Sequence, residues 1–252
     1  MDDFSMKKNA LVLALSTSFL IGNAFAGTMG PVKPSWGWLG EFSVGPAWQS
    51  GGKTQTFYLD PNIEKTYAAD KTTQALADFG VLLGAQYNLN PTLISQFGLA
   101  VGVTTDTSLS GEIWDDADPQ FNNYLYRYKL QHTHLAVKGK LLADMGYVVM
   151  PWVSGSIGVG FNRAYAFNNV PVIEEAVKNP NFTDHTKTSF TYTVGAGIQH
   201  SFTDHLQVGI GYEFADWGKS SLGRAAGQTM NKGISLNHLY TNGFLVNFTY
   251  VR

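Results

Sequence analysis

The sequence contains no cysteine, and charged residues make up only 14% of its 252 residues. Without cysteine the chain has no disulfide framework, no thiolate metal site and no lipid-modified N-terminal cysteine. Ordinary globular domains carry roughly a quarter charged residues, so this composition disfavours a surface that faces water on all sides. The net charge of −2 favours neither nucleic acid nor an anionic membrane surface as a partner. We therefore expect no nucleic-acid partner.

Long apolar runs are also scarce. Beyond the N-terminal region no run of 18 apolar residues occurs, so a membrane crossing there must use strands and not helices. The N-terminal region itself has the parts of an export signal, with a basic start at Lys7 and Lys8 and an apolar core over residues 11–21. Residues 24–26 then supply a small-x-small cleavage site.

These features divide the chain into three parts. Residues 1–26 are expected to be a cleaved signal peptide, residues 27–35 an irregular lead-in, and residues 36–252 a single β-barrel domain. An acidic pair after the first residue is unusual before a basic segment, so translation could begin at Met1 or at Met6.

The clearest pattern in the chain lies over residues 190–215. Two arms of about ten residues, 190–199 and 206–215, alternate between apolar residues and small or polar ones, which predicts an antiparallel hairpin. At ~3.3 Å per residue and ~45° tilt, each arm rises roughly 23 Å, close to the ~25 Å apolar band of an outer-membrane barrel. Aromatic residues lie near the ends of the apolar rows, as in the girdles of such barrels. We therefore expect the apolar face to point outward into lipid, and the glycine-rich face to line the interior.

The same period of two predicts eight strands in all. They are expected over residues 36–49, 78–89, 96–103, 124–141, 153–162, 190–199, 206–215 and 240–250. Long polar loops are expected over residues 50–74, 105–123, 166–188 and 217–235, with a helical turn over residues 171–178. The alternation of long and short connections predicts an all-β, eight-stranded, antiparallel up-and-down transmembrane β-barrel. In the fourth strand the apolar phase changes from even to odd positions, which indicates either a bulge or an extension beyond the membrane.

Three segments of the chain carry a family resemblance: 27–32, 211–214 and 238–250. They resemble the small outer-membrane β-barrel proteins of Gram-negative bacteria, the opacity-like or "porin family" class related to the membrane domain of outer membrane protein A. The resemblance implies export through the periplasm to the outer membrane, with the long loops outside the cell. It also implies contacts with outer-membrane lipid and lipopolysaccharide, periplasmic chaperones and the barrel-insertion machinery. Phe248 and Tyr250 would be the insertion signal, although two further residues follow them.

Charged residues occur at inward positions of the predicted strands. An eight-stranded barrel has an interior just wide enough for side chains to fill, so opposite charges there are expected to pair and to close it. The alternative is a gated path for small ions. The sequence does not indicate which residues pair. The candidates are Glu41, Asp78, Lys138, Lys140 and Glu213.

Two other patterns suggest chemistry only weakly. His132 and His134 have metal-compatible spacing but no evident third ligand. The acidic residues of the second long loop, Glu112, Asp115, Asp116 and Asp118, are expected to be solvated and not to hold a cation. Asp184 and His185, taken with that loop, superficially resemble the omptin proteases, but those barrels have ten strands. We expect no catalytic residue, no metal site and no cofactor.

These observations favour a non-enzymatic integral outer-membrane protein with a role in envelope structure. Its surface-exposed loops would contact external surfaces or an unknown ligand, and their lysines Lys65, Lys71 and Lys178 would be open to protease. The alternative is a narrow porin-like channel for small ions or solutes, and a third is a water-soluble barrel that carries a ligand.

Overall fold

The computed structural model describes residues 36–252 with the exception of residue 72. The predicted signal peptide, the lead-in and the question of the start codon therefore concern residues outside the described part of the chain. Among the described residues, no helix is both long enough and apolar enough to span a membrane.

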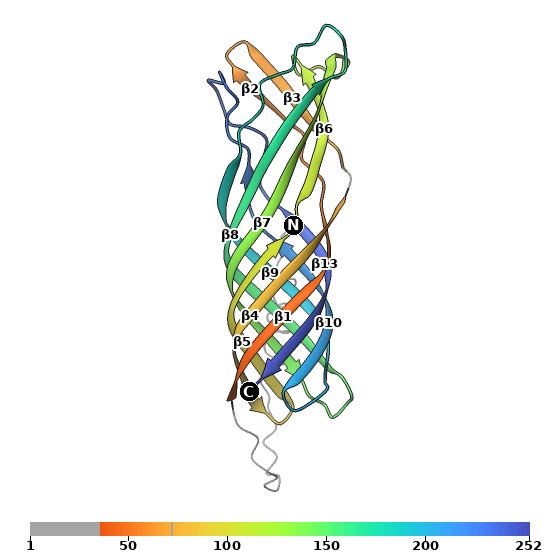
Figure 1. Cartoon of the computed structure of the whole chain (residues 1–252), viewed down its shortest axis with the longest axis vertical. Helices are drawn as coiled ribbons and strands as arrows, with labels where there is room; N and C mark the ends of the chain where they lie inside the picture. Colours follow the sequence, from red (N-terminus) through yellow and green to blue (C-terminus); the bar gives the residue numbers. More distant parts are fainter. Residues whose placement is uncertain (1–35, 72) are drawn as a thin grey trace, which may run out of the picture. The chain divides into compact units, whose positions relative to one another are not determined.

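Eight long antiparallel strands form a hydrogen-bonded ring (Figure 1). Around the ring the order is β7, β5, β4, β1, β13, β10, β9 and β8, and β8 pairs with β7 to return to the start. The eight predicted strands are all present. Their bounds are β1 (Trp36–Gln49), β4 (Gln74–Asn90), β5 (Leu93–Thr104), β7 (Asn122–Ala143), β8 (Met150–Pro171), β9 (His185–Ser201), β10 (Leu206–Asp216) and β13 (Tyr240–Val251).

The side chains of the ring alternate in the predicted phase. Large apolar side chains such as Leu83 and Ile210 are more than half exposed on the outer wall, while Gln96 and Thr249 are fully buried inside. Glycine, serine, threonine and glutamine fill most of the remaining inward positions. The ring therefore has an apolar outer wall and a polar interior, which is the reverse of a barrel that carries an apolar ligand in water.

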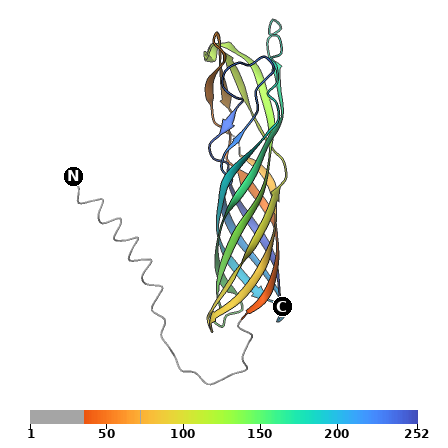
Figure 2. The same ribbon diagram turned by 90° about the vertical axis from the view of Figure 1, so that its left-hand side faces the viewer.

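Connections at the two ends of the ring differ in length. Those after β4, β7 and β9 are short, whereas those after β1, β5, β8 and β10 are long and gather at the opposite end (Figure 2). This matches the predicted alternation of long and short connections.

The long connections are more ordered than predicted. Residues 50–74 and 105–123 were expected to be loops, but they contain strands that widen the sheet to eleven strands. Strand β3 (Ile63–Ala69) pairs with β6 (Thr107–Asp115), and β6 pairs with residues 122–130 of β7. The sequence did not reveal these strands because polar residues and turns interrupt their alternation. The added elements are β2 (Gln55–Asp60), β3 (Ile63–Ala69), β6 (Thr107–Asp115), the 3-10 turn η1 (Pro119–Phe121), β11 (Ser220–Ser221) and β12 (Ser235–Leu236).

Strands β7 and β8 both extend well past the ring, and only β8 changes phase. In β7 the even residues face inward from Tyr124 to Leu142 without interruption. In β8 the inward set changes from even to odd at a bulge around Ala166, whose φ is +53°. The inward residues of β7 are tyrosines beyond the ring and mostly polar residues within it. The apolar residues therefore change from even to odd positions, although the strand itself keeps its phase. The predicted helical turn over residues 171–178 does not form a helix: Pro171 ends β8, and the residues after it form bends and one turn, in which Ala176 N donates to Ile173 O.

The largest hydrophobic core lies beyond the ring, among the long connections. Aromatic and aliphatic side chains from β3, β6, β7, β8 and the segment after β10 pack together there. Backbone hydrogen bonds join the long connections around this core: Thr229 N and Met230 N donate to Leu59 O, and Gly223 N donates to Thr183 O. The buried members include Tyr67, Ile113, Tyr126, Tyr128, Phe167, Phe182, Trp217, Leu222 and Ile234.

Candidate functional site

The charged residues predicted to face inward do so, and two pairs form between them. Lys140 Nζ lies 2.8 Å from Glu41 Oε2, and Lys138 Nζ lies 2.9 Å from Glu213 Oε2. The two lysines are adjacent inward positions of β7, which brings them opposite carboxylates on β1 and β10. The sequence predicted that opposite charges pair inside the ring, but it did not indicate which residues form the pairs.

The pair of Lys140 and Glu41 is almost fully buried, with 1% and 3% of the side chains exposed. Thr249 donates a hydrogen bond to Glu41 (3.1 Å), and Lys140 donates a second bond to Gln199 (2.5 Å). The ammonium also lies 4.8 Å from the centre of the Trp152 ring. Extra partners of this kind offset the cost of removing two charges from water.

A layer of glutamines and an apolar floor lie next to this pair. Gln96 donates to Gln86 (2.8 Å) and to Gln207 (3.3 Å), and Gln199 also donates to Gln207. On the side of the short turns, an apolar cluster fills the ring with the buried residues Leu142, Met150 and Trp152, against which Ile94 packs. These polar and apolar layers leave little open space at this end of the interior.

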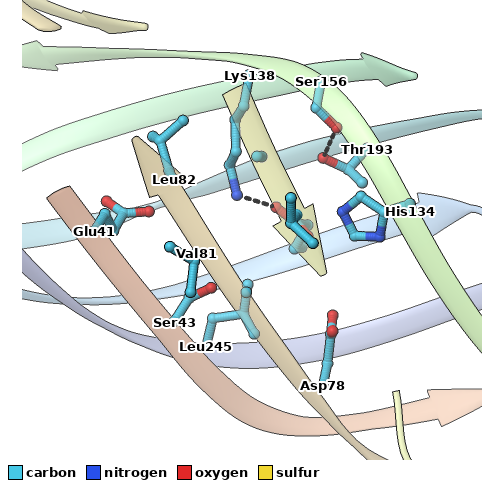
Figure 3. A pocket seen from close by; sticks show the side chains of 14 residues that line it. Glu41, Ser43, Asp78, Val81, Leu82, His134, Lys138, Ser156, Thr193 and Leu245 are labelled. Atoms are coloured by element: carbon cyan, nitrogen blue, oxygen red, sulfur yellow. Dashed lines mark hydrogen bonds and ion pairs between the residues drawn. The ribbon is translucent and has the colours of Figure 1, made fainter. Parts of the chain in front are cut away.

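A small cavity lies beside the second charge pair (Figure 3). Its volume is about 30 Å³, enough for one or two water molecules. Asp78 and His134 line it, together with the hydrogen-bonded hydroxyls of Ser156 and Thr193, 2.9 Å apart. Among the described residues Asp78 has no cation within ion-pair distance, so it is the one predicted inward charge that the structure leaves unpaired.

Trp217 closes the interior on the side of the long connections. Its ring stacks on His132 and His134, with centroids 4.0 and 4.8 Å away. The indole nitrogen donates to Thr241 Oγ1 (2.9 Å), and Asn162 donates to the carbonyl oxygen of Trp217 (2.7 Å). The two histidines therefore belong to a stack of aromatic rings that closes the interior at this end. This role of Trp217 was not predicted, because the residue lies in a segment that was expected to be a loop.

Three of the four acidic residues that were expected to be solvated, Glu112, Asp115 and Asp118, have partners in the structure. Asp115 pairs with Lys65 (2.5 Å) and accepts a bond from Asn123 (2.8 Å), while Asp118 caps η1. Lys65 is only 7% exposed, so its predicted exposure is wrong, whereas Lys71 and Lys178 are exposed. Burial, with smaller effects from a neighbouring tyrosine and from Asp115, raises the pKa of Tyr67 above its ordinary value, so its hydroxyl stays neutral.

Asp184 and His185, which resembled part of a protease site, have different partners in the structure. Asp184 pairs with Arg163 (3.4 Å) and accepts a bond from the Ala166 amide (3.1 Å). His185 instead contacts Ser221, with Nδ1 3.2 Å from the hydroxyl oxygen, a pair that the sequence did not predict. Within the described part of the chain, the hydrogen bonds of the His185 ring go to Ser221 and not to a carboxylate.

The aromatic residues near the C-terminus, Phe248 and Tyr250, lie on the outer wall of β13. The backbone beyond them continues the strand pairing, because Trp38 N donates to Arg252 O and Arg252 N donates to Trp38 O. Their role as an insertion signal remains a prediction.

Comparison with known proteins gives one family and several structural likenesses. A model of the outer membrane protein beta-barrel domain matches residues 39–251. No curated protein matches. Solved structures with a similar fold include Neisserial surface protein A (12% identity, 86% of this chain, 96% of that one, TM-score 0.41). They also include OprG from Pseudomonas aeruginosa (13%, 84%, 96%, 0.38) and Ail of Yersinia pestis (12%, 85%, 98%, 0.33). Likeness at this level identifies no function.

Proposed function

Because the chain belongs to the outer membrane protein beta-barrel domain family, whose place is the Gram-negative outer membrane, we propose that its ring spans that membrane as a closed barrel. We propose further that the protein is non-enzymatic and serves envelope structure and surface interaction. In this role it would contact outer-membrane lipid and lipopolysaccharide, and an external ligand or surface whose identity is unknown.

The observation that carries this proposal is the filled interior. The apolar floor, the glutamine layer, two ion pairs and the Trp217 stack succeed one another along the axis. The cavity between them holds one or two waters at most. An interior of this kind suits a membrane anchor better than a diffusion pore.

The ordered long connections support a role at the cell surface. They share a buried aromatic core and are tied to one another by backbone bonds, so they present a fixed surface and not a set of independent loops. A fixed surface loses less conformational freedom on binding than a mobile one.

A narrow channel remains the second candidate, and one feature favours it. The unpaired carboxylate of Asp78 faces a water-sized cavity on the axis, where a small ion would need a polar contact. Single-channel recording of the purified, refolded protein separates the two functions. We expect an electrically silent bilayer, with a sixteen-stranded porin in the same bilayer as the positive control. Steady, reproducible conductance steps from the purified protein would instead establish the channel.

Trypsin added to intact cells tests the orientation. We expect cleavage after Lys178, which is exposed in the connection between β8 and β9, and no early cleavage after Lys65, which is buried in its ion pair with Asp115. Mass spectrometry of the released fragments gives the sites. A Lys178→Gln variant should lose the first cut. If trypsin instead cuts at the exposed residue Lys232 only after the cells are broken, the long connections face the periplasm and the proposed orientation is wrong.

A further inference from the structure

Outward-facing cations are concentrated on one wall of the ring, where its apolar band ends. On β8 the outward row runs through Ile157, Val159 and Phe161 and then reaches Arg163. On β7 the row passes from Leu135 through polar positions to two further cations, Lys129 and Arg127. The outward rows of the other ring strands end on this side with uncharged residues: Trp48, Ala75, Val103, Thr186, Phe214 and Tyr240.

Strand pairing places these cations close together. Lys129 is paired with Tyr165, and Gln131 with Arg163, so Lys129 and Arg163 are diagonal neighbours on adjacent strands, with about 7–8 Å between their Cα atoms. The Arg163 guanidinium lies 4.5 Å from the centre of the Tyr165 ring. Arg127 follows on the same face of β7, with Nη2 3.4 Å from Ser108 Oγ. We call Arg127, Lys129 and Arg163 the cationic patch.

Two carboxylates hold the cationic patch in place without covering it. Lys129 lies 3.5 Å from Asp106, and Arg163 lies 3.4 Å from Asp184, with about 36–54% of each side chain exposed. Exposed pairs of this kind contribute only about 0–1 kcal/mol, so a stronger anion could take over the cations. Three cations against two carboxylates also leave the patch with a net positive charge.

We propose that the cationic patch binds the phosphate groups of a lipid headgroup in the outer leaflet. Arginine and lysine form their strongest hydrogen bonds with phosphate oxygens, and arginine can bind two of them at once. The patch begins where the apolar wall ends, which is the depth of the phosphates when acyl chains lie against that wall. Tyr165 beside it has the amphipathic character of an interfacial aromatic residue. This inference rests on the membrane orientation proposed above.

Titration with phosphorylated lipid tests the site. The signal-processed chain, refolded in neutral dodecyl maltoside micelles, is titrated with bisphosphorylated lipid A and with the same lipid after removal of its phosphates. Native mass spectrometry measures the bound fraction. We expect at least about tenfold tighter binding of the phosphorylated lipid, and loss of about that preference in Lys129→Gln/Arg163→Gln. Inorganic phosphate in large excess should not compete, because it lacks the acyl chains.

A charge-matched control is Lys53→Gln/Lys71→Gln, which removes two exposed cations that lie outside the patch. This variant should bind like the parent. Equal loss in both variants, or no preference for the phosphorylated lipid, would overturn the assignment. Full competition by inorganic phosphate would show a free-phosphate site and would also overturn it. Lys129 is partly exposed and the other substituted residues are exposed, and unboiled electrophoretic mobility checks that each variant is folded. If binding fails while the protein still fractionates with the outer membrane, only this inference falls.

Discussion

Lys140→Met is expected to lower the free energy of unfolding by about 3–5 kcal/mol, because it leaves the buried carboxylate of Glu41 without its cation. Thr249 would still donate to Glu41, but one hydroxyl does not replace an ammonium ion. Gln199 would lose its bond from Lys140 as well. Urea titration of the protein folded in lipid vesicles, followed by tryptophan fluorescence, gives the change.

Two companion variants isolate the cause. Lys140→Met with Glu41→Gln removes both charges and should recover most of the loss, since replacing a whole buried pair by neutral groups is often close to neutral. Lys129→Met removes a lysine from an exposed pair with Asp106 and should cost no more than about 1 kcal/mol. Equal costs for Lys140→Met and Lys129→Met would mean that the interior is open to water and that the charges do not close it.

The inward direction of these charges could be predicted from the sequence, but their pairing could not. Alternation with period two assigns each residue of a strand to one face, and this was enough to place Glu41, Lys140 and Glu213 inside. Which inward residues meet depends on the stagger between strands that are neighbours in space and far apart in sequence. Lys140 and Glu41 are 99 residues apart, on strands that are not adjacent in the ring.

The region beyond the ring was the part least predictable from the sequence. In the predicted fourth strand the apolar residues Tyr124, Tyr126 and Tyr128 lie at even positions and the later apolar residues at odd positions, which left open whether the strand is bulged or extends beyond the membrane. These tyrosines face inward. Tyr126 packs against Tyr67 and Phe167, which lie in segments that were predicted to be loops. The alternation identified one face of β7 correctly, but it could not show that the interior changes from polar to apolar where the long connections supply their own core.

Ile210→Arg is expected to cost about 2–4 kcal/mol of unfolding free energy in lipid vesicles, because it places a guanidinium in hydrocarbon near the middle of the wall. Ile210 lies in the middle of β10, is exposed on the outer face, and pairs with Ile198 and Val246. The matched variant Thr188→Arg changes another exposed outward position, on β9, but it lies beyond Phe190 at the end of the apolar row. There the arginine reaches the interface, and its cost should be about 0–1 kcal/mol. Urea titration of both variants measures the difference. If Thr188→Arg proves the more costly of the two, the wall that meets lipid is not the one assigned here, and the proposed membrane span fails with it.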